Sequence, residues 1–189
     1  MVKSLCVTRQ WMRTMDYCNK NTFTIEMKQR YMRPIIDLYK IPTLIDTGAV
    51  IPVFSFSTLD MKEIFGANII KKGAEITGFG GRDRGSIYSI PQFTIGTITF
   101  TPFEVFVPEV LRVKYPILLS APVFYGTDYE FDTRHNLFKV SWDDDYPKER
   151  SFRIQELKGE LYPQVNGVLL QISDDELTTK IIYEYNGKS

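Results

Sequence analysis

The amino-acid sequence predicts a mainly β fold with one short helix, and three observations support this prediction. Short apolar segments alternate with turn-forming residues along most of the 189-residue chain. A glycine-rich stretch at residues 78–81 lies between two such segments, as at the tip of a β-hairpin. Residues 57–66 are the one clear helix candidate. With 43% hydrophobic residues, the chain has the composition of a folded globular protein.

The first part of the chain is expected to form extended segments followed by the helix. Apolar residues partly alternate with polar ones over residues 23–39, and residues 43–45 form a short apolar run that stops at Asp46. Residues 50–56 are again apolar and predict a further strand. The helix is expected to have Ser57 or Thr58 as its N-cap and to end at Gly66.

Residues 74–107 are predicted to be entirely β. The segments 74–77 and 86–90 flank the glycine-rich hairpin tip, and residues 93–96 and 99–107 continue the meander. Residues 115–119 are continuously apolar, which predicts a buried strand. Residues 129–140 alternate around a turn at Asn136 and predict a second hairpin.

A domain boundary is predicted at residues 143–148, where a run of aspartates and a proline interrupt the β pattern. Beyond it, residues 152–157, 168–172 and 180–185 are expected to be strands, separated by Gly159, Gly167 and an acidic turn. We therefore expect an N-terminal segment of unknown role at 1–22, a main domain at 23–142 and a β-rich C-terminal extension at 143–189.

The charge and composition argue against several function classes. Lysine plus arginine equals aspartate plus glutamate, 23 each, so no field of one sign favours nucleic acid or an anionic membrane as a partner. Two cysteines, Cys6 and Cys18, and one histidine, His135, are too few for a typical zinc site, and we expect neither a metal nor a cofactor. His135 and the aspartates 143–145 are interpreted as surface residues. With no signal-peptide pattern and no apolar run of membrane-spanning length, a cytoplasmic location is expected.

The most informative stretch is the sequence Asp46-Thr47-Gly48-Ala49 that follows the apolar run. Taken alone, an Asp-Thr-Gly triplet is an ordinary turn after a strand. Here an apolar strand is predicted on each side of it, and the glycine-rich hairpin and the apolar run at 117–119 follow in that order.

In these stretches the chain resembles the retropepsin-like aspartic protease family over residues 30–140. Three motifs support the resemblance: the active-site loop at 44–49, the flap at 76–81 and the apolar strand at 116–120. This chain has Leu119-Ser120 where the family has a glycine after two apolar residues. The resemblance implies a retropepsin-like acid protease barrel for the main domain, without a cofactor.

The resemblance also implies roles for individual residues. Asp46 is the expected catalytic residue, supported by Thr47, Gly48 and Ala49 of the same loop. Thr47 would hydrogen-bond across a dimer axis, and glycine at position 48 lets the backbone turn sharply beside the carboxylates. The flap is expected to close over a polypeptide substrate, and its residues are Gly78, Phe79, Gly80 and Gly81.

The number of catalytic loops predicts the assembly. Hydrolysis by this chemistry needs two carboxylates about 3 Å apart that share one proton. The chain contains the Asp-Thr-Gly triplet once, and Asp132-Thr133-Arg134 lacks the glycine. A homodimer with one Asp46 from each chain is therefore expected, acting as an endopeptidase. The alternative is a non-catalytic module that keeps the fold for dimerisation or peptide binding.

The predicted substrate is an extended peptide with apolar residues on both sides of the scissile bond. Val50 and Ile51 follow the catalytic loop directly, and Ile117 and Leu118 belong to the strand expected behind it. These four side chains are expected to leave mainly apolar pocket walls.

Overall fold

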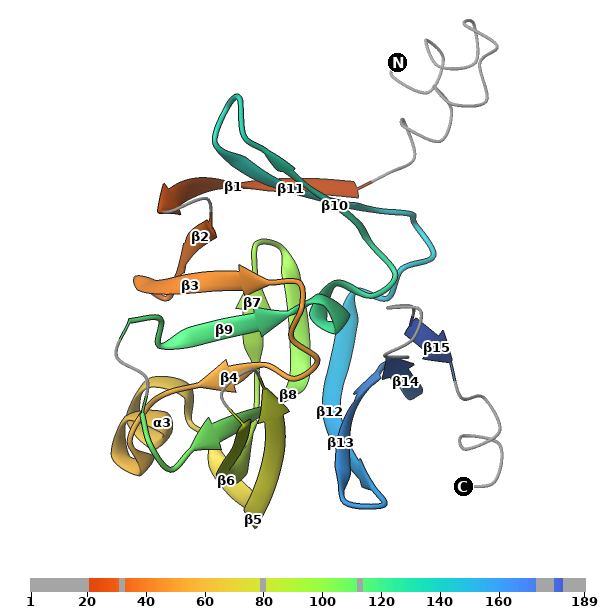
Figure 1. Ribbon diagram of the computed structural model, residues 1–189. Helices are drawn as coiled ribbons and strands as arrows, with labels where there is room; N and C mark the ends of the chain where they lie inside the picture. Colours follow the sequence, from red (N-terminus) through yellow and green to blue (C-terminus); the bar gives the residue numbers. More distant parts are fainter. Residues whose placement is uncertain (1–20, 31–32, 79–80, 112–113, 173–178, 182–189) are drawn as a thin grey trace, which may run out of the picture.

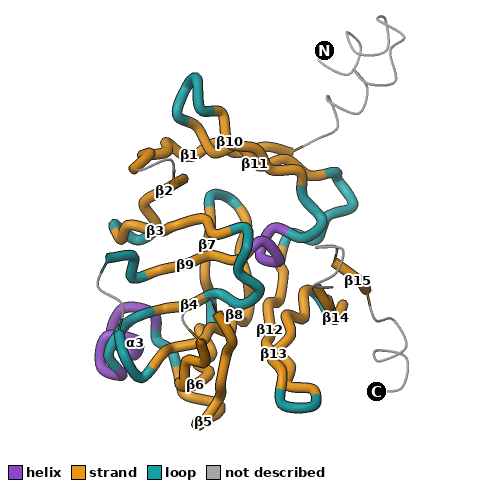
Figure 2. The backbone as a smooth tube through the Cα atoms, viewed as in Figure 1, coloured by secondary structure: helices purple, strands orange, loops and turns teal. Residues whose placement is uncertain are grey.

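The computed structural model describes residues 21–30, 33–78, 81–111, 114–172 and 179–181. Strands make up most of this part of the chain, as Figure 2 shows, so the predicted mainly β fold class is confirmed. Cys6, Cys18 and the N-terminal segment 1–20 lie outside the described residues. Within the described part, no helix is long and apolar enough to cross a bilayer.

All the described strands are linked into one sheet, whose order is β10-β11-β1-β2-β3-β9-β4-β8-β12-β13-β14-β15. The β5–β6 hairpin and the short strand β7 are attached to β8 outside this path (Figure 1). The strands up to β9 are β1 (Asn21–Arg30), β2 (Arg33–Leu38), β3 (Ile41–Asp46), β4 (Val53–Phe54), β5 (Asn68–Gly78), β6 (Gly81–Ile90), β7 (Phe93–Ile95), β8 (Ile98–Pro108) and β9 (Ile117–Ser120). After the 3-10 helix η1 (Ala121–Phe124) come β10 (Asp128–Asp132), β11 (Leu137–Trp142), β12 (Glu149–Leu157), β13 (Glu160–Val165), β14 (Val168–Ile172) and β15 (Thr179–Ile181).

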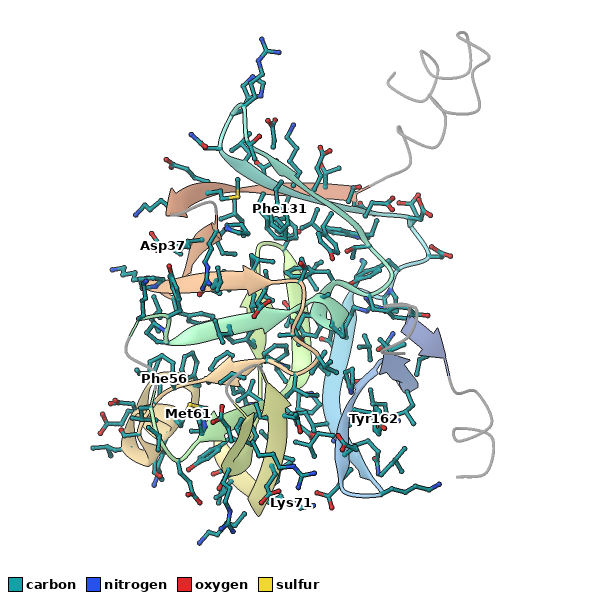
Figure 3. All side chains as sticks on the ribbon, in the orientation of Figure 1. Asp37, Phe56, Met61, Lys71, Phe131 and Tyr162 are labelled. Carbon is teal, nitrogen blue, oxygen red and sulfur yellow. The ribbon has the colours of Figure 1, made fainter. Side chains whose placement is uncertain are left out.

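The helix α3 (Thr58–Phe65) forms where the sequence predicts it. The Ser57 hydroxyl caps its start by accepting a hydrogen bond from the Asp60 N–H at 3.1 Å. Gly66 ends it in the left-handed conformation, with φ of 62°, and donates its N–H to the Lys62 carbonyl oxygen. Met61 and Phe65 are the buried residues of the helix, and Met61 is labelled in Figure 3.

Tight turns fix the register of neighbouring strands. Tyr39 and Lys40 both have positive φ between β2 and β3, which is the backbone of a type I′ hairpin turn. Positive φ angles are also found in the turns on either side of β13, at Lys158-Gly159 and at Asn166-Gly167. The predicted 129–140 hairpin is confirmed as β10 and β11, with Asn136 at a φ of 54°.

Two strand predictions need correction. The expected strand at 50–56 is reduced to the two residues of β4, because residues 47–52 form the loop that leads into it. Strand β13 was not predicted, since Pro163 and its polar neighbours do not resemble a strand. Pro163 is nevertheless accommodated opposite Ile154 of β12. Of the strand expected at 180–185, only residues up to Ile181 lie within the described residues.

The main hydrophobic core is rich in phenylalanine. The rings of Phe93 and Phe103 stack with centroids 4.7 Å apart, and Phe152 of β12 packs on Phe103 at 5.3 Å. Val165 of β13 and Leu170 of β14 belong to the same core. The described part of the C-terminal extension therefore shares its core with residues 23–142, and β12 runs parallel to β8 in the same sheet.

Candidate active site

Asp46 is the last residue of β3, at the edge where two parallel strands end. Strand β3 pairs with β9 so that Asp46 lies in register with Ser120. The three residues before Asp46 are buried, Asp46 itself is half-buried, and Thr47 and Gly48 are exposed. The carboxylate thus lies where a strongly apolar strand reaches the surface.

The loop after β3 holds this carboxylate through its own backbone. The Gly48 N–H donates to Asp46 Oδ1 at 3.1 Å, and the Ala49 N–H donates to the Asp46 carbonyl oxygen at 3.1 Å. A charge-assisted hydrogen bond of this kind fixes the orientation of the carboxylate. The loop therefore orients Asp46 through its own backbone.

Strand β9 lies between the two strands that the loop connects. It is parallel to β3 on one side and antiparallel to β4 on the other, where Val53 lies opposite Leu118. The loop 47–52 therefore passes around the carboxyl end of β9 (Figure 1). The predicted buried strand is confirmed, and Ser120 does not interrupt its pairing with β3.

Ser120 is a residue of this site that the sequence did not assign to it. It is fully buried. Within the described part of the chain, its hydroxyl has no hydrogen-bond partner. In the sequence, Ser120 directly follows the apolar run 117–119, and this pattern indicates that position 120 is also buried.

The predicted flap region is a β-hairpin. Strands β5 and β6 are antiparallel and meet at the Gly78–Gly81 pair, while Phe79 and Gly80 lie outside the described residues. The other edge of β6 pairs with β8 from Gly85 to Ile90, which attaches the base of the hairpin to the sheet. Across the hairpin, Glu75 lies 3.4 Å from Arg82 and 3.7 Å from Arg84, so one carboxylate pairs with two guanidinium groups on this face.

An apolar cluster, which we call the loop-side cluster, contains residues of both the Asp46 loop and the hairpin. Its buried members are Ile35, Leu44, Ile51, Val53, Ala74, Ile87, Phe106, Tyr115, Leu118 and Leu161, and Val50, Ile76 and Ile154 pack against it. The loop, β9 and the hairpin thus contribute side chains to one apolar cluster.

The structure places three of the four predicted pocket residues in the loop-side cluster: Val50, Ile51 and Leu118. Ile117 belongs to the main core instead, because successive residues of a strand point to opposite faces. Leu161 and Ile154 of the C-terminal extension were not predicted to lie near this region. No local pattern links them to residues about 100 positions earlier in the chain.

His135 and the acidic run are surface features, as predicted. His135 Nδ1 lies 2.9 Å from Asp132 Oδ2, and the His135 side chain is exposed. Hydrogen bonds from Lys139 and then His135 hold the pKa of the Asp132 carboxyl well below its usual range. Asp143, Asp144 and Asp145 are exposed. Among the residues that the structure describes, no group of histidine, cysteine, aspartate or glutamate could hold a metal ion.

Comparison with protein-family models, curated proteins and solved structures finds no match for this chain. A functional assignment therefore rests on the residues of the site itself.

Proposed function

We propose that the protein is an aspartic endopeptidase that acts as a homodimer, with the Asp46 carboxylates of two chains forming its active site. One observation supports this proposal most directly. Asp46 is fixed by the Gly48 N–H at the end of a buried strand, on a loop whose next two residues are exposed. A fixed carboxylate on an exposed turn is suited to meet a second copy of itself.

The proposed chemistry uses the two carboxylates in different protonation states. The ionised carboxylate takes a proton from water, and the water oxygen attacks the peptide carbonyl carbon. The protonated carboxyl gives its proton to the carbonyl oxygen as the tetrahedral intermediate forms. When that intermediate collapses, the carboxyl that took the water proton gives it to the leaving nitrogen and the C–N bond breaks. A hydroxyl of the intermediate returns its proton to the other carboxylate, which restores one proton on the pair. Two carboxyl groups about 3 Å apart do not both ionise, because their negative charges would repel each other. The pair therefore keeps one proton.

A two-fold dimer supplies the second carboxylate. The chain has one Asp-Thr-Gly triplet, and an isologous interface brings the same loop of each chain together. Thr47 is exposed, and we propose that it hydrogen-bonds across this axis. The position of β9 between β3 and β4 supports the finer proposal that residues 23–142 adopt the retropepsin-like barrel arrangement.

The proposed substrate is an extended polypeptide with apolar side chains next to the scissile bond. The loop-side cluster supports this, because Val50 and Ile51 of the loop pack with Leu118 and with Ala74 of the hairpin. A profile of cleaved peptides dominated by charged residues at both flanking positions would contradict the proposed pocket.

The first test is the substitution Asp46→Asn, which keeps the shape of the side chain and removes both the base and the acid. We expect loss of cleavage of a mixed peptide library, measured by mass spectrometry, with the dimer retained in light scattering. Cleavage by the purified variant would refute the mechanism. Peptide binding by both forms without cleavage by the wild type would indicate the non-catalytic module instead.

A mixing experiment tests the shared site separately. Wild-type chains are exchanged with an excess of Asp46→Asn chains at a fixed total concentration. If each site needs Asp46 from both chains, activity falls with the square of the wild-type fraction, because mixed dimers are inactive. A fall in direct proportion to that fraction would show that one chain suffices.

A further inference from the structure

The C-terminal extension lies against the hairpin that is proposed to cover the substrate. Strand β13 packs beside β5, and Leu161 of β13 is buried in the loop-side cluster together with Ala74 of β5. Ile154 of β12 packs on the same cluster. Lys71 of β5 forms an ion pair with Glu156 of β12 (Lys71 is labelled in Figure 3). Both strands of the extension hairpin thus touch the β5 side of the flap.

The extension is itself firmly attached to the rest of the molecule. Buried Glu104 of β8 accepts a hydrogen bond from the Ile154 N–H at 2.8 Å, beside the place where the β8–β12 register shifts. Buried Arg150 donates to the Tyr125 carbonyl oxygen, and its guanidinium lies 3.8 Å from the centre of the Tyr146 ring. These contacts hold β12 in place, so β12 and β13 can support a neighbouring element.

The hairpin needs such support on its β5 side. In the described part of the chain, β5 pairs only with β6, and its pairing shifts register between Ile69 and Lys71 and again before Ala74. Beyond Gly85, where β6 no longer pairs with β8, the hairpin has two strands only, and a two-stranded ribbon is marginally stable in water. The exposed Lys71–Glu156 ion pair adds little by itself, whereas Leu161 is a buried apolar residue of the cluster that contains Ala74 of β5.

We infer that the β12–β13 unit braces the β5–β6 hairpin and that Leu161 is a positioning residue, acting on substrate through the hairpin. This inference deepens the proposed function and rests on it for the effect on catalysis. The brace itself is a property of the folded chain and is measurable without any substrate.

The test compares Leu161→Ala with Leu170→Ala, both measured on the full-length chain. Leu170 is the matched control, because it is a buried leucine of the same extension that belongs to the main core. Amide hydrogen exchange is followed at residues 68–77 and 82–90. We expect Leu161→Ala to speed exchange in these segments relative to the rest of the protein, and Leu170→Ala to leave the hairpin no faster than other regions.

Kinetics on a cleavable peptide provide the second readout. Leu161→Ala is expected to raise KM several-fold with a smaller change in kcat and an unchanged pH profile, since the Asp46 loop is not altered. Leu161→Met, which nearly conserves volume, should restore both exchange and KM.

If amide hydrogen exchange in the hairpin is unchanged in Leu161→Ala, the inference that the extension braces the hairpin is wrong. Faster exchange with an unchanged KM would overturn the positioning role. If the wild type cleaves no peptide, the proposed function is wrong, and hydrogen exchange alone still decides whether the extension braces the hairpin.

Discussion

Ser120 is a buried residue beside Asp46, the proposed catalytic residue, and has an unusual environment. It lies in register with Asp46 at the end of β9 and is fully buried. Its hydroxyl has no hydrogen-bond partner within the described residues. A buried hydroxyl without a partner costs roughly 1–3 kcal/mol of folding free energy. The Ser120 hydroxyl is therefore expected to lower the folding stability of the protein.

Removing that hydroxyl should stabilise the protein. Ser120→Ala is expected to raise the free energy of unfolding by about 1 kcal/mol, because the smaller apolar side chain leaves no unsatisfied group. Urea denaturation at a fixed protein concentration measures the change, since a dimer's apparent stability depends on concentration. A loss of stability would indicate that the hydroxyl has a partner in the assembled dimer.

Gly85 determines how closely the hairpin element approaches the sheet. A Cβ at this position would overlap the Val107 carbonyl oxygen and lie 2.7 Å from Cζ of the Phe106 ring and 2.9 Å from the Pro108 Cα. Two of these three atoms belong to the backbone of β8, which cannot move aside cheaply. Glycine is therefore required at 85 for close packing rather than for an unusual φ.

We expect Gly85→Ala to lower the free energy of unfolding by roughly 1–3 kcal/mol, the usual cost of overpacking. Gly73 serves as a control, because a Cβ there meets nothing within 4 Å. Its φ of 70° suits asparagine, so Gly73→Asn should cost much less in the same denaturation experiment. Equal effects of the two substitutions would show that the close approach at Gly85 is not strained.

Glu104 makes the attachment of β12 sensitive to pH. Burial raises the pKa of this carboxyl above its ordinary value of 4.5, although the Ile154 N–H and Arg153 oppose the shift. The folded state therefore binds the proton more tightly than the unfolded state does. The stability gained from this group is complete below pH 4.5 and is lost as the pH rises through the folded pKa.

Glu104→Gln should remove this loss of folding stability at higher pH. Glutamine keeps an oxygen to accept from the Ile154 N–H but has no charge to bury. We expect the variant to gain stability relative to wild type as the pH rises from 4.5 to 8, measured by denaturant unfolding across that range. Glu160→Gln, at an exposed position of β13, should show no such trend. A parallel pH dependence of Glu104→Gln and wild type would contradict the assignment.

Across the whole molecule, the elements predicted best are those determined by neighbouring residues. Ser57 and Gly66 define the helix because their capping interactions are local. Strand β13 was missed because its pairing partners, and not its own sequence, make it a strand. The same distinction applies to the site. The Asp46 loop is readable as a short motif, whereas the contact between Leu161 and the hairpin depends on chain segments far apart in sequence.

The last prediction concerns the pH dependence of the proposed activity. Carboxylic acids in water lose their proton near pH 4, and a facing pair shares one proton over the range in which only one member is ionised. Raising the pH removes the shared proton and with it the acid, whereas lowering the pH protonates the base. We therefore expect a bell-shaped profile of kcat/KM with its optimum on the acidic side of neutrality, both limbs belonging to the pair.

His135 is the one histidine in the sequence, so it is the residue to test as another source of the basic limb. The structure places it on an exposed turn between β10 and β11, bonded to Asp132, and the loop-side cluster contains no residue of that hairpin. His135→Ala should consequently leave both limbs in place. A profile that is flat from pH 4 to 9, or that loses its basic limb in this variant, would exclude the shared-proton pair. Because the pair exists only in the dimer, the height of the profile should also fall on dilution below the dimer dissociation constant while its shape stays the same.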